Sequence, residues 1–340
     1  MQDLDFRKIY SNYLSKVDER LNSFLTEQTH IDKVSNKKRS IPQSLYNQTN
    51  YIMMGKGKRV RPLMLIFSCE AFGGTMEQAL DAAVAVEILH NFTLVHDDIM
   101  DNADSRRGKE TVHKKWSVNA AILVGDELIG LSYRSLLKTR SKRLDEIVKA
   151  FTDGVIEVCE GQALDKEFET DDKIKMSDYI TMIRKKTAEL IRVSAVIGSL
   201  IAEASDTEIE AISNFSHNIG IAFQIQDDLL DITADEKKLG KKTGSDIDEK
   251  KKTYLYLKAL ELLHGIKRDK FISLYNSDNK KGARKKSIMD LYFDICAVES
   301  ARKDIQTYTV KANKYLSHVS NSGSREKLRY FSDMLLTRNY

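Results

Sequence analysis

Apolar residues recur at intervals of three and four along most of this chain, which is the spacing of amphipathic helices. The clearest case is Ala82–Asp101, which reads AAVAVEILHNFTLVHDDIMD without a glycine or proline and predicts one long, largely buried helix. Only two prolines, Pro42 and Pro62, are present to interrupt helices. We therefore predict an all-α protein rather than one with alternating strands and helices.

Start and stop signals divide the pattern into further helices. Thr75 and Gln78 form a capping box for the helix that includes Ala82–Asp101, and Gly73 and Gly74 end the helix before it. The polar stretch 29–40 predicts a loop. The remaining helices are expected over residues 3–28, 42–54, 62–72, 115–138, 143–162, 177–204 and 206–232.

Composition narrows the class of protein. No linker rich in proline, glycine or serine divides the 340 residues, so we expect a single all-helical domain over residues 1–340. A content of 41% hydrophobic residues is enough for a large core. Because 54 Lys and Arg oppose 50 Asp and Glu, the net charge of +4 does not indicate nucleic-acid binding.

Other segments bear on compartment and redox state. No apolar stretch reaches the roughly 20 residues of a membrane span, and Met1–Tyr10 lacks the apolar core of a signal peptide. We therefore expect a cytoplasmic protein that is not an integral membrane protein. Cys69, Cys159 and Cys296 are far apart, each in an apolar helical context, which predicts small buried hydrophobes rather than disulfides or a metal site.

Three aspartates close the long helix. Asp97 and Asp101 are four residues apart and share a face, with Asp98 beside them. Crowded carboxylates raise one another's pKa unless a cation lies between them, and hard oxygen ligands suit Mg²⁺. A solvated acidic helix end would explain one such cluster equally well.

A second cluster favours the metal interpretation. Residues 220–231 read GIAFQIQDDLLD, so Asp227, Asp228 and Asp231 repeat the first spacing 130 positions later. Two aspartate clusters, each at the end of an apolar helix, could face each other across a bundle and hold several metal ions around one polyanion.

Basic residues gather near glycines and helix ends. Residues 55–62, GKGKRVRP, place cationic donors and mobile backbone before a helix N-terminus, as anion sites require. Arg106 and Arg107 stand beside Gly108 shortly after the first aspartates, where they can bind diphosphate oxygens bidentately. Lys186 and Thr187 interrupt an apolar helix. Lys241, Asp246 and Lys251 occupy a loop that could close over phosphates, whereas residues 279–286, NKKGARKK, predict a solvated connection or, less favoured, attraction to an anionic membrane surface.

These motifs resemble, in residues and order, the trans-isoprenyl diphosphate synthases of the polyprenyl synthetase family. The resemblance spans roughly Gly55 to Thr253, and it departs from the family pattern in the glycines of the basic loop and at Lys250, where a glycine is usual. It implies an all-α bundle around a central cavity, usually a homodimer, with three Mg²⁺ ions bridging the aspartates and an allylic diphosphate. The motifs are KRVRP, HDDIMD with RRG, GQ-x-x-D, KT, QIQDDLLD and GKKTGSD.

The resemblance also implies a role for each matching residue. Asp97, Asp101 and Asp227 would bind the metals. Arg106, Lys186, Thr187, Gln224, Lys241 and Lys251 would hold the allylic diphosphate, and Lys58, Arg61, His90 and Arg107 would hold isopentenyl diphosphate. Asp98, Gln162, Asp165, Asp228 and Asp231 would lie in or beside the metals' water shell. The catalytic set would be Asp97, Asp98, Asp101, Lys186, Asp227, Asp228 and Lys241.

The reaction implied is head-to-tail condensation of isopentenyl diphosphate with an allylic diphosphate. Phe92 lies about 7.5 Å along the helix axis before Asp97, and Thr93 lies on the aspartate face, so a ring there could block a long product. Similar short-chain members imply C15 to C20 products, with geranylgeranyl diphosphate favoured. Ordinary core packing remains open for Phe92 and for His90, and His96 is taken as structural.

Rival functions remain at this point. They are a longer-chain polyprenyl diphosphate synthase, a class I terpene cyclase or head-to-head synthase, and a non-catalytic regulatory subunit. A regulatory subunit would be expected to lose metal ligands, whereas this chain retains both aspartate clusters.

Overall fold

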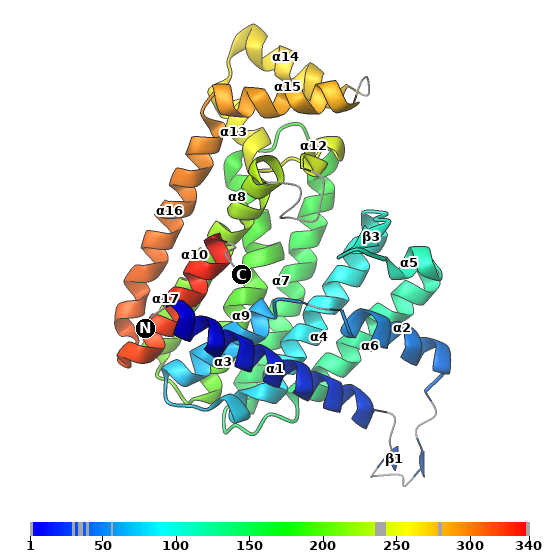
Figure 1. Ribbon diagram of the computed structural model, residues 1–340, viewed down its shortest axis with the longest axis vertical. Helices are drawn as coiled ribbons and strands as arrows, with labels where there is room; N and C mark the ends of the chain where they lie inside the picture. Colours follow the sequence, from blue (N-terminus) through cyan, green and yellow to red (C-terminus); the bar gives the residue numbers. More distant parts are fainter. Residues whose placement is uncertain are drawn as a thin grey trace. The chain divides into compact units, whose positions relative to one another are not determined.

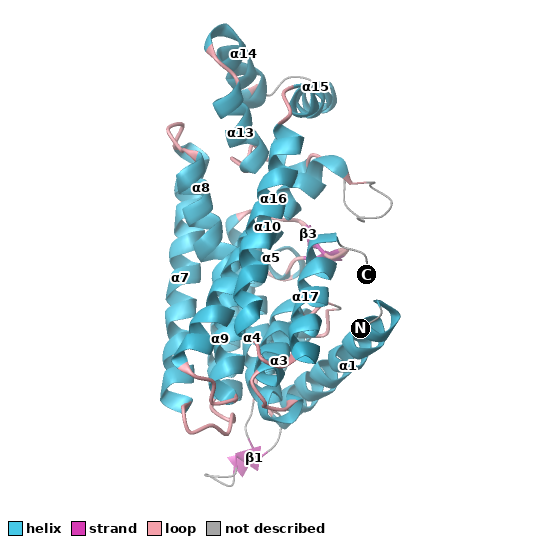
Figure 2. Cartoon of the chain, turned by 90° about the vertical axis from the view of Figure 1, so that its left-hand side faces the viewer, coloured by secondary structure: helices cyan, strands magenta, loops and turns pink. Residues whose placement is uncertain are grey.

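The computed structural model is helical almost throughout (Figure 1). In the described part of the chain, strands occur only as two antiparallel pairs of two residues per strand (Figure 2). The predicted all-α class is therefore confirmed. The structure describes residues 3–28, 31–32, 37–38, 41–55, 57–234, 243–277 and 281–337.

Contacts group the chain into two compact units, and each is described by itself. Unit 1 comprises Met1–Val155, Leu190–Ser213 and Ser317–Phe331. Unit 2 comprises Ile156–Glu189, Asn214–Leu316 and Ser332–Tyr340. The expectation of a single domain over residues 1–340 stays a prediction.

Unit 1 is organised around α4, Met76–Met100, which packs against α3, Val60–Ala71, and α6, Val118–Leu136. Much of the buried surface of α4 is alanine, so neighbouring helices approach it closely. Its capping box is present, because the Gln78 amide donates to the Thr75 hydroxyl and the Gln78 side chain accepts from the Thr75 amide. The other elements lying wholly in this unit are α1 Asp3–Glu27, β1 Ile31–Asp32, β2 Lys37–Lys38, α2 Gln43–Met53, β3 Ser105–Arg106, β4 Lys109–Glu110 and α5 Val112–Lys115.

Four longer helices and one short one cross the division between the units. They are α7 Leu144–Thr170, α9 Glu189–Ile201, α10 Asp206–Thr233, α17 Ser322–Thr337 and the 3₁₀ turn η2 Leu316–His318. Unit 2 alone contains α8 Met176–Ile183, η1 Arg184–Ala188, α12 Ser245–Asp248, α13 Tyr254–Leu262, α14 Gly265–Asn276, α15 Lys281–Asp294 and α16 Ala297–Tyr315.

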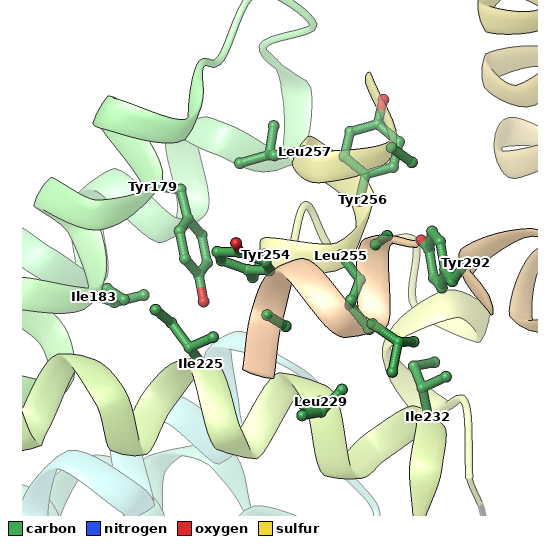
Figure 3. Close-up of a cluster of buried hydrophobic side chains, with 14 of the residues drawn as sticks. Tyr179, Ile183, Ile225, Leu229, Ile232, Tyr254, Leu255, Tyr256, Leu257 and Tyr292 are labelled. Atoms are coloured by element: carbon green, nitrogen blue, oxygen red, sulfur yellow. The ribbon is translucent and has the colours of Figure 1, made fainter. Parts of the chain in front are cut away.

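Tyrosines mark the core of unit 2 (Figure 3). The rings of Tyr179 and Tyr254 meet edge to face with centroids 6.3 Å apart, and those of Tyr256 and Tyr275 lie 4.4 Å apart. A buried tyrosine contributes a large apolar ring and a hydroxyl that needs a partner. The core of this unit can therefore extend hydrogen bonds toward polar side chains at its edge.

Several sequence expectations need correction. The segment expected as one helix over 177–204 is α8, the π-helix η1 and α9 in succession. The expectation of a solvated connection over 279–286 is wrong for Arg284, which lies in α15 and is only 3% exposed. Residues 279–280 lie outside the described ranges. Cys69 is buried as expected, but Cys159 and Cys296 are exposed; all three are free thiols. None of the described helices is long and apolar enough to span a bilayer.

Candidate active site

The first aspartate cluster occupies the last turn of α4 and the residue that caps it. Asp97 and Asp101 are partly exposed, whereas Asp98 is 3% exposed. The Asp98 carboxylate accepts a hydrogen bond from Nε of Arg106 at 2.7 Å. Burial raises the pKa of Asp98 although Arg106 opposes the shift. The middle carboxylate is thus held inside the protein, and its two neighbours lie along the more accessible helix face.

A tight hairpin directs Arg106 back to Asp98. Strands β3 and β4 are joined by Arg107 and Gly108, both with left-handed backbone, at φ values of 52° and 75°. Two consecutive left-handed residues match the hairpin turn that a right-handed strand twist favours. The turn places adjacent guanidiniums, those of Arg106 and Arg107, beside the aspartate helix.

Three arginines surround His90 on α4. Burial, followed by repulsion from Arg61, Arg107 and Arg106, keeps the pKa of His90 well below its ordinary value. Burial also lowers the pKa of Arg61 to about 10, although Glu87 opposes the shift and Arg107 adds to it. Nδ1 of His90 and Nε of Arg61 are buried and have no hydrogen-bond partner among the described residues. Converging cationic donors with buried polar atoms left unsatisfied suit a polyanionic ligand.

The basic loop before α3 divides into two kinds of residue. Arg59 is buried and forms ion pairs with Glu87 at 2.6 Å and Asp18 at 2.8 Å, so it belongs to the scaffold. Lys58 has an exposed side chain, and its carbonyl accepts a hydrogen bond from the Tyr10 hydroxyl at 2.8 Å. Gly57 gives the arginines room, because a Cβ there would lie 3.1 Å from Nη1 of Arg107.

A pocket of about 340 Å³ opens within unit 1 where α2, α4 and the β3–β4 hairpin meet. Its wall carries the charged residues Asp98, Arg106, Arg107, Lys109 and Glu110 together with apolar and aromatic side chains. Such a wall can accept a charged head and a short hydrocarbon together. It is lined by Tyr51, Ile52, Met54, Gly55, Asn91, Leu94, Val95, Asp98, Arg106, Arg107, Lys109, Glu110 and Thr111.

The predicted product-length residues lie one turn above the first aspartates. Phe92 is 7% exposed, and its ring meets that of His96 edge to face with centroids 4.7 Å apart. His96 in turn fills the space over Gly125 of α6, where a Cβ would lie 2.1 Å from Nε2. The Thr93 hydroxyl donates to the His90 carbonyl of its own helix. Phe92 and His96 therefore form one layer of rings.

The second aspartate cluster, in unit 2, repeats the burial pattern of the first. Asp227 is exposed and Asp231 partly exposed, but Asp228 is 6% exposed. The Asp228 carboxylate accepts three hydrogen bonds, from the Tyr179 hydroxyl at 2.6 Å, the Tyr254 amide at 2.9 Å and Nε2 of Gln224 at 2.9 Å. Burial, which these bonds oppose, raises its pKa.

The π-helix η1 contains Lys186 and Thr187, the two polar residues singled out from the sequence within an apolar helix. Lys186 donates to Asp165 at 2.6 Å, and the Thr187 hydroxyl donates to Oε1 of Gln224 at 2.8 Å. Single π-turns inside helices often occur at functional sites. Thr187, Gln224 and Asp228 consequently form one hydrogen-bonded row that reaches the second aspartate cluster.

Two glycines accommodate the π-helix. A Cβ at Gly161 of α7 would lie 2.3 Å from the Lys186 amide nitrogen, and one at Gly220 of α10 would lie 2.5 Å from Cα of Ala188. Both clashes are with backbone or with atoms fixed to it, so flexible side chains cannot relieve them. Gln162, next to Gly161, is 8% exposed.

The site residues fall into one set within each unit. Lys251, in unit 2, pairs with Glu249 at 2.8 Å. Lys241 lies outside the described residues. In the described part of the chain, no three histidine, cysteine or carboxylate side chains converge as a metal-binding group. Unit 1 holds Lys58, Arg61, His90, Asp97, Asp98, Asp101, Arg106 and Arg107; unit 2 holds Gln162, Asp165, Lys186, Thr187, Gln224, Asp227, Asp228, Asp231 and Lys251.

Comparison with known proteins decides the family. The sequence profile described as polyprenyl synthetase matches residues 42–292. The chain belongs to the polyprenyl synthetase family. It is 42% identical over 338 residues to a geranylgeranyl diphosphate synthase of Sulfolobus acidocaldarius, covering 97% of this chain and 98% of that protein. It is 37% identical over 330 residues to a short chain isoprenyl diphosphate synthase of Methanocaldococcus jannaschii, covering 97% and 95%.

Structural comparison agrees with this membership. The solved geranylgeranyl pyrophosphate synthetase from Pyrococcus horikoshii superimposes with a TM-score of 0.88 at 33% identity, covering 98% of this chain and all of that one. The expected polyprenyl synthetase family and its prenyltransferase class are thereby confirmed, and members of the family generally depend on a divalent metal. The role of each site residue stays a prediction.

Replacing Gly161 by Ala should displace the π-helix, because the added Cβ would meet the Lys186 backbone. We expect unfolding free energy to fall by about 1–3 kcal/mol and prenyltransferase kcat/KM by about 10²-fold, as for a misplacement of about 1 Å. Urea unfolding and steady-state kinetics measure the two effects. Gly282→Ala, where a Cβ would meet nothing within 4 Å, is the control. Wild-type kinetics in Gly161→Ala would contradict the argument.

Acid should destabilise the protein through His90. Its depressed pKa keeps it neutral when folded, whereas the unfolded chain takes up a proton below pH 6.5. The unfolding free energy should therefore decrease as pH falls from 6.5, by up to about 1.4 kcal/mol per pH unit. Urea titrations at pH 7.5, 6.5 and 5.5, without substrate, should show a weaker dependence in His90→Gln.

The exposed His264 provides the control for this titration. His264→Gln should keep the wild-type pH dependence. If the curves of His90→Gln and wild type ran parallel over the three pH values, the assignment of the acid sensitivity to His90 would be wrong.

Proposed function

We propose that this prenyltransferase condenses isopentenyl diphosphate with an allylic diphosphate, head to tail, to give all-trans geranylgeranyl diphosphate. The observation that carries the proposal is the cationic cluster of Arg61, Arg106 and Arg107 about His90 in unit 1, in which Nε of Arg61 and Nδ1 of His90 are buried without a hydrogen-bond partner among the described residues. A diphosphate is a ligand that such converging donors fit. The names of the relatives in Sulfolobus and Pyrococcus support the C20 product.

From the family resemblance we infer that three Mg²⁺ ions would bind per site. Asp97, Asp101 and Asp227 would be the ligands, as the family resemblance implies; their carboxylates are at least partly exposed, as is that of Asp231. Hard carboxylate oxygens suit this cation. When bound, Mg²⁺ would neutralise the negative charge that develops as diphosphate departs. Asp98 and Asp228 would then act by holding the helix ends in place, since their oxygens are already hydrogen-bonded within the protein.

The chain's cations would bind the two substrates and stabilise the leaving group. Lys58, Arg61, His90 and Arg107 would hold isopentenyl diphosphate. Fixed cationic donors aimed at the departing diphosphate cost no reorganisation as the allylic carbon–oxygen bond breaks. The double bond of isopentenyl diphosphate then attacks the allylic carbocation, and the released diphosphate takes the proton that restores the alkene. Arg106, Lys186, Thr187, Gln224, Lys241 and Lys251 would hold the allylic diphosphate.

Quaternary state and location are also proposals. An apolar face of α6 is exposed at Val118, Ile122 and Leu123, whose exposed fractions are 48%, 41% and 58%. Clustered exposed aliphatic side chains are typical of a subunit interface. We therefore favour a homodimer that uses this face. A cytoplasmic location stays a prediction from the sequence.

One incubation tests the reaction directly. Purified protein is mixed with isopentenyl diphosphate and dimethylallyl, geranyl or farnesyl diphosphate, with and without Mg²⁺, and the products are sized by chromatography. A Mg²⁺-dependent product that stops at C20 is expected. Longer products would indicate a longer-chain synthase. If the protein does not consume isopentenyl diphosphate, a cyclase or a regulatory subunit would be indicated instead.

Asp97→Ala should lower kcat/KM by about 10²–10³-fold, because the variant would lose a carboxylate that is proposed to hold Mg²⁺ against the reacting diphosphate. Circular dichroism should remain that of the wild type, since Asp97 is not part of the core. Asp104→Ala is the matched control, because the Asp104 side chain is 88% exposed and forms an ion pair with Lys114 at 2.9 Å. Near wild-type turnover in Asp97→Ala would remove the metal assignment.

Phe92→Ala should lengthen the products beyond C20, because it removes the ring that packs edge to face against His96 about one turn before Asp97 on α4. Chromatography of the extended products is the measurement. Phe67→Leu serves as the control for a loosened core, since Phe67 packs with Phe6 and Phe331 on other helices. Unchanged product length in Phe92→Ala would place the floor of the product pocket elsewhere.

A further inference from the structure

Arg284 is buried, although it lies in a run of basic residues that would ordinarily be exposed to solvent. It lies in α15 within the sequence ARKK, yet its residue is only 3% exposed. Nη1 donates to the carbonyls of Tyr275 at 3.0 Å and Ser277 at 2.8 Å, and Nη2 donates to the Ile247 carbonyl at 3.0 Å. A buried arginine that satisfies backbone carbonyls of other segments is a fixed connector rather than a surface charge.

One of these segments is α12, which follows the second aspartate motif. Its first residues bind Asp231: the Ser245 hydroxyl donates at 2.6 Å, and the amides of Ser245 and Asp246 donate at 3.2 Å. Its last residues include Ile247, which Arg284 holds, and Asp248, which pairs with Lys285 at 3.0 Å. The four-residue helix is therefore fixed at one end by Asp231 and at the other by α15.

The second segment leads to Lys251. The Tyr275 hydroxyl donates to the Lys251 carbonyl at 2.5 Å, and the Lys251 amide donates to the Asp246 carbonyl at 2.9 Å. Arg284 binds the carbonyl of Tyr275, and the hydroxyl of the same tyrosine binds Lys251. Arg284 also binds the Ile247 carbonyl, so one guanidinium restrains residues 246–251 near both ends. Tyr275 is 1% exposed, so its ring cannot compensate by moving into solvent.

We propose that Arg284 is a positioning residue for the allylic diphosphate side of the site. It acts by fixing residues 245–251, which bind the Asp231 carboxylate and lead to Lys251, and it touches no substrate itself. The inference rests on the proposed function, in which Lys251 and the second aspartate cluster serve the allylic diphosphate and its metal. The residues proposed for isopentenyl diphosphate belong to unit 1, whereas every contact of this network lies within unit 2.

The test compares the two substrates in Arg284→Met. The KM for farnesyl diphosphate and the Mg²⁺ concentration at half-maximal rate should each rise about 10-fold, as is typical when a group that supports a metal ligand is lost. The KM for isopentenyl diphosphate should stay within about twofold of wild type. General destabilisation would lower the active fraction and kcat without this selectivity. Lys286→Met removes an exposed cation two residues later and should leave all three values unchanged.

Hydrogen exchange gives a readout that is independent of turnover. In the metal-free protein, the amides of residues 245–251 should exchange at least tenfold faster in Arg284→Met than in wild type or Lys286→Met. Unchanged exchange together with an unchanged KM for farnesyl diphosphate would overturn the proposal, as would an equal rise in both KM values.

Two milder variants apply if Arg284→Met does not fold. Tyr275→Phe deletes only the hydroxyl that reaches Lys251, and Arg284→Lys keeps the charge but loses the fork of donors. Each should raise the KM for farnesyl diphosphate selectively, by about threefold or more, and wild-type values in both would refute the role of Arg284. If wild-type protein does not consume isopentenyl diphosphate, the proposed function itself fails, whatever the exchange data show.

Discussion

The organisation of the site depends on a buried carboxylate in the middle of each aspartate motif. A charged group is costly to bury unless hydrogen bonds or an ion pair satisfy it. Asp98 meets this requirement with Arg106, and Asp228 meets it with Tyr179, Gln224 and the Tyr254 amide. Fixing the middle residue fixes the rotation of the helix end. The flanking carboxylates are then presented together, although their mutual repulsion would otherwise favour separation.

The cationic cluster of Arg61, His90, Arg106 and Arg107 in unit 1 presents the opposite electrostatic problem, because basic groups are crowded together there. Burial lowers the pKa of both Arg61 and Arg107, and repulsion from Arg107 lowers that of Arg61 further; burial also holds the pKa of His90 well below its ordinary value. A protein selected for stability alone would not gather these groups and leave Nε of Arg61 and Nδ1 of His90 unsatisfied. Crowded basic groups with unsatisfied polar atoms occur where a bound anion supplies the compensating negative charge. This cluster therefore gives the proposal of a diphosphate ligand its physical basis.

Sequence periodicity was sufficient for the all-α class and for most of the helices, although the segment expected as one helix over 177–204 is α8, η1 and α9 in succession. The capping box at Thr75 and the spacing of Asp97 and Asp101 could be predicted because both depend on residues within one or two turns. The burial of Arg284 and the exposure of Cys159 could not, since each depends on segments distant in sequence. The π-turn at Lys186 could not be predicted either. Gly161 and Gly220 are required beside it, because a Cβ at either position would clash with the backbone of the π-helix.

Product length illustrates why spacing along one helix is an incomplete argument. The axial rise gives the distance from Phe92 to the aspartates, but it does not say what supports the ring. In the structure His96 contacts that ring, and His96 occupies space that exists because Gly125 has no Cβ. A residue on α6 thus helps to define the layer that α4 presents. Under the role proposed for Phe92, the depth available to the product would therefore depend on two packed helices, and substitutions at Gly125 would alter the same layer of rings as those at Phe92.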